Sequence, residues 1–167
     1  MSIRTILLGI VFATHLAAAE SESSLQAQII GKVVKFITWE NENSDSFIIT
    51  VLNNPFGDEL DKHYKNSKIK GKKVDIRYIK SLNELGNTDL LYVSNVSSSE
   101  LQSVINRAKN KNILTMSDVR GFAEKDGVIQ VTFVAQKPKL KINLARAKEE
   151  NLQIKSSLLQ IAEVIKG

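Results

Sequence analysis

Cysteine is absent from this sequence of 167 residues, histidine occurs twice, and aromatic side chains are few. Without cysteine the chain forms no disulfide, carries no thiol nucleophile and offers no thiolate ligand to zinc. One histidine, His15, lies in the first 19 residues, and the other, His63, lies in a lysine-rich segment. A lone histidine provides neither a metal cluster nor a Ser-His-Asp triad. The low aromatic content argues against stacking on bases or sugars.

The first 19 residues have the pattern of a secretory signal peptide. Arg4 supplies the positive end, residues 6–16 form an apolar run too short to span a bilayer, and Ala17–Ala19 form a small-residue cleavage site. We therefore predict cleavage near Ala19, export to the periplasm and one domain over residues 20–167. A retained anchor helix is the alternative. Cleavage removes one base and no acid, so the formal net charge falls from +5 to +4.

Lysine dominates two stretches of the chain. Such spacing is typical of a solvated face, and it leaves open a weak attraction to an anionic membrane surface. Because export separates the protein from nucleic acid, we expect no nucleic-acid partner. The lysines of the two stretches are Lys62, Lys65, Lys68, Lys70, Lys72 and Lys73, and Lys137, Lys139 and Lys141.

Apolar residues after the signal peptide alternate between the spacing of helices and that of strands. Leu25, Ile29 and Val33 recur at helical spacing, and this stripe continues to Trp39. Residues 47–52 form a continuous apolar run, which suits a strand buried on both faces of a parallel sheet. The next expected elements are helices at 55–64 and 97–109 and strands at 74–79, 89–93 and 113–116.

The C-terminal part has a different pattern. Residues 139–144 alternate polar and apolar side chains, a period typical of a strand with one face on the core. We expect this strand to pair antiparallel with residues 127–135 across a turn at Gln136–Pro138. Apolar residues at helical spacing then predict an amphipathic helix over 154–165.

Strands that alternate with helices predict right-handed βαβ units and a parallel sheet. We therefore predict an α/β fold: a single-domain three-layer sandwich with a mostly parallel sheet and an antiparallel C-terminal strand pair. With the strands at 47–52, 74–79, 89–93 and 113–116 numbered 1 to 4, the expected order is 2-1-3-4.

The sequence contains no recognisable catalytic motif. Asp58, Glu59 and Asp61 lie near the start of an expected helix. Acidic side chains there stabilise the helix by ~0.3–1 kcal/mol each through its dipole. A carboxylate pair for acid–base catalysis is the alternative. Lys70–Lys73 precedes a strand, which is the reverse of a phosphate-binding loop, and no Gly-x-Ser-x-Gly turn is present. We expect no enzymatic activity, no cofactor and no metal.

Polar residues follow two of the expected parallel strands. Asn53, Asn54 and Phe56 follow the first, and Ser94 and Asn95 follow the third. Ligands of open parallel sheets bind beyond the carboxyl ends of strands, and a helix N-terminus there presents N–H groups to an anion. These five residues form our candidate ligand crevice. Alternatively they are turn formers and caps, as such residues usually are.

A Gly-Phe loop follows the fourth strand and suggests a partner-binding surface. An exposed Phe122 would anchor a partner, whereas a buried ring would close the core beneath the loop. Our candidate partner-binding residues are Asp118, Arg120, Gly121 and Phe122 in this loop and Leu159 on the expected final helix. A second apolar side of that helix would meet a partner or another copy of the chain.

Four groups of residues occur in order along nearly the whole mature chain. They are Phe36-Ile37-Thr38-Trp39; Val51 to Leu60 with Pro55-Phe56-Gly57; Leu114 to Asp118 with Gly121-Phe122-Ala123; and Ile142-Asn143-Leu144 followed by Leu152, Ser156-Ser157-Leu158-Leu159 and Ala162. This ordered set resembles the YfiR-like (HmsC-like) family of periplasmic regulators. The sequence departs from the family pattern by lacking a cysteine pair and by having Asp126, Lys141 and Asn151 in place of a glycine, a glutamate and a glycine.

The resemblance implies a periplasmic, usually dimeric protein without enzymatic activity. Characterised members of the family repress a membrane diguanylate cyclase by contacting its periplasmic sensor domain, and release raises cyclic di-GMP, exopolysaccharide and biofilm formation. We therefore expect a membrane-bound signalling partner, a diguanylate cyclase or a histidine kinase, and a homodimer. The alternative is a small-molecule-binding module that feeds a sensor or a transporter.

Overall fold

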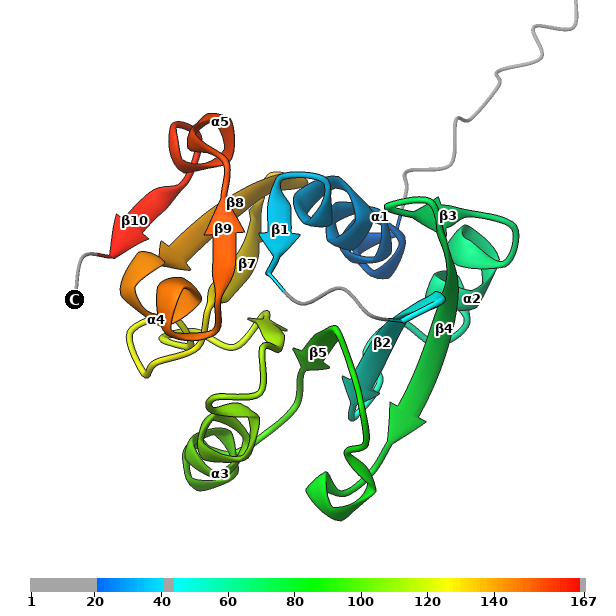
Figure 1. The fold of residues 1–167 in the computed structure, drawn as a ribbon, viewed down its shortest axis with the longest axis horizontal. Helices are drawn as coiled ribbons and strands as arrows, with labels where there is room; N and C mark the ends of the chain where they lie inside the picture. Colours follow the sequence, from blue (N-terminus) through cyan, green and yellow to red (C-terminus); the bar gives the residue numbers. More distant parts are fainter. Residues whose placement is uncertain (1–20, 41–43, 166–167) are drawn as a thin grey trace, which may run out of the picture.

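The computed structural model describes residues 21–40 and 44–165, so the predicted signal peptide and its cleavage site lie outside the described residues. Within them, an eight-stranded, mostly parallel sheet has the order β10-β8-β7-β6-β5-β2-β4-β3 (Figure 1). Its strands are β2 (Ser46–Leu52), β3 (Lys68–Ile69), β4 (Lys72–Ile79), β5 (Leu90–Val93), β6 (Leu114–Ser117), β7 (Ile129–Val134), β8 (Lys137–Asn143) and β10 (Glu163–Ile165).

The four parallel strands expected from the sequence lie side by side in the order β4-β2-β5-β6. β2 pairs with β4 from Ser46 opposite Lys73 to Leu52 opposite Ile79, and β5 pairs with its other edge. Every residue of β2 after Ser46 is buried. A strand with neighbours at both edges and apolar layers on both faces has no solvent side, which explains its continuous apolar run.

β7 and β8 form the expected antiparallel hairpin. Their pairing runs from Ile129 opposite Ile142 to Val134 opposite Lys137. Residues 135 and 136 have φ values of 48° and 60°, the left-handed geometry that suits a two-residue hairpin turn. Pro138 therefore lies inside β8 and not in the turn. The edge of β8 that faces β10 is paired only at residues 141–143, so β10 loses no hydrogen bond to the missing N–H of Pro138.

Both expected terminal helices are wrong in part. α1 (Glu22–Val34) ends before Trp39, and Ile37–Trp39 form strand β1. Residues 154–165 form no continuous helix but the end of β9 (Leu152–Ile154), the single turn α5 (Ser156–Leu159) and strand β10. β1 pairs antiparallel with β9, so two segments far apart in the sequence determine each other's conformation. Local periodicity does not report such a pairing.

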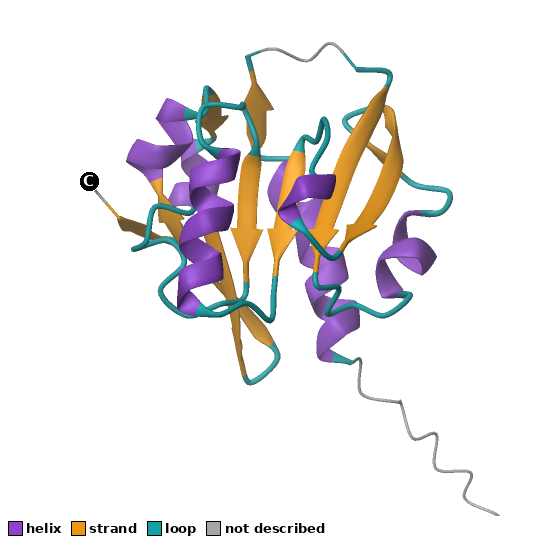
Figure 2. Cartoon of the chain, turned by 90° about the horizontal axis from the view of Figure 1, so that it is seen from below, coloured by secondary structure: helices purple, strands orange, loops and turns teal. Residues whose placement is uncertain are grey.

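Side chains of β5 alternate between two apolar clusters. Leu90 and Tyr92 pack in one cluster with α1 and α2 (Glu59–Tyr64), and Leu91 and Val93 pack in the other with α3 (Ser98–Ala108). Figure 2 shows helices on both faces of the sheet. The short helix α4 (Leu144–Glu149) follows β8, and the 3-10 turn η1 (Leu82–Glu84) follows β4. The helices of the described residues are all too short or too polar to cross a membrane.

Candidate functional site

The carboxyl ends of β2, β5 and β6 meet at one edge of the sheet, and polar residues that follow these strands touch there. Asn53 Nδ2 donates to the carbonyl oxygen of Asn95 at 3.4 Å, and the two residues have positive φ values of 54° and 52°. Ser94 Oγ donates to Asp118 Oδ2 at 2.9 Å. The structure thus brings together the candidate crevice residues Asn53, Ser94 and Asn95, and it adds Asp118 from the loop after β6.

The other two candidate crevice residues serve the turn and the core. Asn54 Oδ1 accepts from the Phe56 N–H at 2.9 Å, and Asn54 Nδ2 donates to the Gly57 carbonyl at 2.8 Å. The Phe56 ring is buried edge-on against Tyr92, with 4.7 Å between the ring centroids. For Asn54 the turn-former interpretation is therefore right, and Phe56 fixes the turn to the core.

Tyr92 lies beneath this edge, and its buried hydroxyl has no hydrogen-bond partner in the described part of the chain. Burial, together with the nearby carboxylates of Asp118 and Glu22, raises the pKa of Tyr92 well above its usual range, so the hydroxyl stays protonated. Burial also raises the pKa of Asp118, and the hydrogen bond from Ser94 opposes that rise. A buried hydroxyl without a partner gains free energy from any polar group that reaches it.

A cavity of about 230 Å³ opens beside Asn53 on the α3 side of this edge, and Val96 and Glu100 also line it. At the start of α3, Ser97 Oγ accepts from the Glu100 N–H at 3.3 Å, and the Glu100 carboxylate accepts from the Ser97 N–H at 2.8 Å. Ser97 and Glu100 therefore form a capping box at the start of α3. The described residues of the lining thus contain one carboxylate, Glu100, which is engaged in the cap, and one cation, Lys80.

Phe122 is fully buried, so the hypothesis of an exposed anchor is wrong and the alternative of a ring that closes the core is right. Its N–H donates to Gln130 Oε1 at 3.0 Å and to the Val119 carbonyl at 3.2 Å. A side chain at Gly127 would overlap the Phe122 ring. In the predicted partner loop, the Arg120 side chain is exposed. Gly121 follows it with a φ of 79°.

Leu159, the other candidate for partner binding, lies in the single turn α5 and not on a long helix. Its side chain is half-buried against the core cluster that contains α1. The apolar side chain that protrudes nearby is Ile161, which is 73% exposed. The predicted second apolar side of a final helix is therefore not present in residues 154–165, and the exposed Ile161 side chain after α5 stands in its place.

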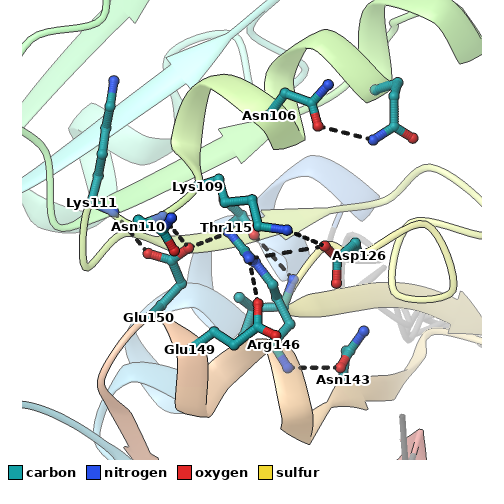
Figure 3. Close-up of polar contacts among 12 residues, drawn as sticks. Asn106, Lys109, Asn110, Lys111, Thr115, Asp126, Asn143, Arg146, Glu149 and Glu150 are labelled. Carbon is teal, nitrogen blue, oxygen red and sulfur yellow. Dashed lines mark hydrogen bonds and ion pairs between the residues drawn. The ribbon is translucent and has the colours of Figure 1, made fainter.

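A dense polar cluster that sequence reasoning missed centres on Arg146 and Glu150 (Figure 3). The Glu150 carboxylate accepts from the consecutive N–H groups of residues 110–112 at 2.9, 3.0 and 3.0 Å, and it is paired with Arg146. Arg146 also contacts Glu149 at 2.7 Å and Asp126 at 3.9 Å. The i,i+4 spacing of Arg146 and Glu150 was the available signal, but it did not reveal that both side chains are buried.

The cluster around Arg146 joins three segments of the chain. Asn143 Oδ1 accepts from the Arg146 N–H at 2.9 Å and starts α4, while Asn143 Nδ2 donates to the Ala123 carbonyl at 3.1 Å. Thr115 Oγ1 accepts from the Val128 N–H at 3.0 Å. Because its buried charges are paired and its polar groups saturated, this arrangement fixes the Phe122 loop and the 110–112 turn and offers no free acid or base.

The acidic residues near the start of α2 are also engaged. Asp58 and Glu59 contact Lys62 at 2.9 and 3.1 Å, and the hydrogen bond from Lys62 lowers the pKa of Asp58. Asp61 accepts a hydrogen bond from the Tyr78 hydroxyl. His63 is exposed on the same helix, edge-on to Tyr64. Among residues 21–40 and 44–165, no three metal-ligating side chains of His, Asp or Glu gather in one place.

Two solved structures share the fold of this chain. A conserved domain protein from Vibrio cholerae O1 biovar El Tor is 13% identical with a TM-score of 0.60, and the match covers 87% of this chain and 60% of that one. A domain from Streptococcus pneumoniae, solved in complex with L-Trp, is 17% identical with a TM-score of 0.56, and the match covers 83% and 60% of the two chains. This chain thus spans about 60% of the length of either structure.

No curated protein matches the sequence. A family model described as YfiR/HmsC-like matches residues 23–163. The match takes in α1, the whole sheet up to the start of β10, the polar carboxyl edge and the Arg146 cluster. The chain therefore belongs to the YfiR/HmsC-like family.

Proposed function

We propose that this protein is a periplasmic, non-enzymatic regulator, exported with cleavage near Ala19, that binds and represses the periplasmic sensor domain of a membrane signalling protein. A diguanylate cyclase is the expected partner and a histidine kinase the second choice. Repression would hold down cyclic di-GMP, exopolysaccharide and biofilm formation. The observation that carries this proposal is the family match over residues 23–163.

The chemistry of the described residues supports a binding role. The carboxylates near α2 contact Lys62 and Tyr78, and the buried charges of the Arg146 cluster neutralise one another. General acid–base catalysis needs a titrating group free to exchange a proton with a substrate. The surface we assign to the partner is the loop around Arg120, with Ile161 as an apolar contact in a homodimer or with the same partner.

The test is performed in the host cell. Deletion of this protein should raise cyclic di-GMP and biofilm mass, and the wild-type chain supplied in trans should restore both. Arg120→Glu should fail to restore them, whereas Arg107→Glu, at another exposed arginine on α3, should succeed. Unchanged cyclic di-GMP after deletion would refute the regulatory role, and equal rescue by the two variants would refute the assigned surface.

A small-molecule-binding module is the second candidate, and the hydroxyl of Tyr92 favours it. This buried donor has no partner among the described residues and lies close to Asp118 at the edge where ligands of parallel sheets bind. One structural relative was solved with L-Trp, which makes amino acids a reasonable first set of probes. A ligand should raise the unfolding temperature of the wild-type chain in a concentration-dependent way and leave that of Tyr92→Phe less affected. No shift with any amino acid would count against this candidate.

A further inference from the structure

A cavity near the C-terminal end of α1 has a strongly basic lining. It lies between α1, α2 and β3 and has a volume of about 230 Å³. None of the described residues that line it is acidic. The basic side chains that line it are Lys32, Lys35, His63, Lys68 and Lys70.

A second cavity of about 360 Å³ adjoins the first. The two share Tyr64, Ser67 and Lys68, and the second adds Lys65 and Lys73 to the basic lining. The described residues that line this second cavity also include no acid. The two cavities therefore adjoin at Lys68, and we call them together the basic depression. Their combined size is large enough for a small molecule.

Most lysines of this depression have no carboxylate partner among the described residues. Elsewhere in the described residues, Lys62, Lys109 and Lys141 each contact a carboxylate. Five lysines of the depression form no ion pair within residues 21–40 and 44–165: Lys32, Lys35, Lys65, Lys68 and Lys73. Like charges collected on neighbouring elements repel one another, so an anion that entered would be favoured by several of them at once.

Hydrogen bonds hold the residues that the two cavities share in place. Tyr64 Oη accepts from the Gly31 N–H at 2.7 Å and donates to the Ala27 carbonyl at 2.9 Å, which ties α2 to α1. Burial raises the pKa of Tyr64 to about 12, so this hydroxyl adds no negative charge. Ser67 Oγ donates to the His63 carbonyl at 2.9 Å and fixes the chain between α2 and Lys68.

We propose that this depression binds a phosphoryl group, either of a soluble phosphorylated compound or of a phospholipid headgroup. Lysine binds phosphate as a compact point charge, and several lysines around one cavity suit an anion with more than one negative charge. The described part of the depression contains no arginine, so binding would rest on lysine point charges and not on a bidentate guanidinium. This site lies apart from the Arg120 loop and does not depend on the regulatory role.

The probe that tests the site is sodium pyrophosphate, titrated into the ¹⁵N-labelled mature chain at low salt. We expect saturable amide shifts at the C-terminal end of α1, the end of α2 and β3. The triple variant Lys32→Gln, Lys35→Gln, Lys68→Gln should weaken binding by about tenfold, the loss expected when three partly exposed charge contacts are removed. Because the three lysines are solvent-facing, the variant should fold like the wild type, which its amide spectrum reports.

A matched triple variant controls for net charge: Lys137→Gln, Lys139→Gln, Lys148→Gln removes three exposed lysines on β8 and α4. It should bind pyrophosphate within about twofold of the wild type, since distant exposed charges are screened by salt. Equal weakening in the two triple variants, shifts spread over the whole chain, or no saturation would overturn the proposal.

Vesicles distinguish the two sources of the phosphoryl group. Cosedimentation with phosphatidylglycerol vesicles, but not with phosphatidylcholine vesicles, and its loss in the Lys32, Lys35, Lys68 variant would identify a lipid headgroup. Pyrophosphate binding without cosedimentation would identify a soluble phosphorylated compound. Vesicle binding that survives in this variant would assign the membrane contact to another surface and overturn the lipid form of the proposal.

Discussion

Arg146 and Glu150 form an ion pair in which the two side chains are only 3% and 1% exposed. The same Glu150 carboxylate accepts from three consecutive N–H groups of the turn at residues 110–112. A buried charge costs several kcal/mol of desolvation, which is offset here by a partner charge and by saturated hydrogen bonds. The pair therefore links α4 to the turn that precedes β6, and the loss of either partner removes the buried counter-charge of the other.

Glu150→Gln should lower the free energy of unfolding by about 3–5 kcal/mol, because it removes the buried counter-charge of Arg146, whose other contacts, Glu149 and Asp126, are about half exposed. Urea denaturation followed by circular dichroism measures the change. Glu149→Gln is the matched control: Glu149 also contacts Arg146, but it is 55% exposed, and its loss should cost less than about 1 kcal/mol. Equal losses in the two variants would show that burial does not determine the strength of this pair.

Gly127→Ala should destabilise the protein by about 1–3 kcal/mol through overpacking, because the added methyl group overlaps the Phe122 ring in a filled core. Thermal unfolding by calorimetry measures the loss. Gly86→Ala introduces the same methyl group where no atom lies within 4 Å and φ is not positive. Its stability should stay within about 0.5 kcal/mol of the wild type. A Gly127 variant as stable as the Gly86 variant would contradict the fixed position of the ring.

The parallel part of the sheet could be predicted from the sequence because it is encoded locally. β2 is a continuous apolar run, and the lysines of β8 alternate with Leu140 and Ile142. The C-terminal segment could not be predicted in the same way. Ile154, Leu158 and Ile161 have helical spacing, yet Ile154 pairs with Ile37 across the β1–β9 ladder. The free energy of that long-range pairing outweighs a local helical preference.

Only the part of the candidate site that follows from the order of the parallel strands could be predicted from the sequence. Asn53, Ser94 and Asn95 meet because parallel neighbouring strands end at the same edge of a sheet. The burial of Phe122 depends on Gly127, which leaves room for the ring, and a single loop segment does not show that relationship. The Arg146–Glu150 pair was missed because charged residues on a short helix are usually exposed.

Tyr92→Phe should leave the unliganded protein as stable as the wild type or about 1–3 kcal/mol more stable, because it removes a buried hydroxyl without a partner. Tyr64→Phe removes a hydroxyl that makes two hydrogen bonds and ties α2 to α1, so it should lose about 1–3 kcal/mol. Urea midpoints of the two variants compare these effects directly. A destabilised Tyr92→Phe would mean that its hydroxyl has a partner in solution, such as an ordered water.

Asp118→Asn should change the pH dependence of stability with a defined sign. Burial raises the pKa of Asp118 above its usual value of 3.8, so the folded chain holds this proton to a higher pH than the unfolded chain. As the pH rises from 3.8 through the folded pKa, Asp118 ionises at a cost, and the wild type loses stability relative to the variant. Above that window the difference should be constant, and urea midpoints measured across it report the effect.

Asp58→Asn is the control of opposite sign for this pH experiment. The hydrogen bond from Lys62 lowers the pKa of Asp58 below 3.8, so its ionised form favours the folded chain. This contribution is fully present above the unfolded pKa and is lost as the pH falls through the folded pKa, so the Asp58 variant should lose stability relative to the wild type as the pH rises through that range. Two difference curves of the same sign would contradict the burial of Asp118 beside Ser94, which places this carboxyl in the candidate crevice.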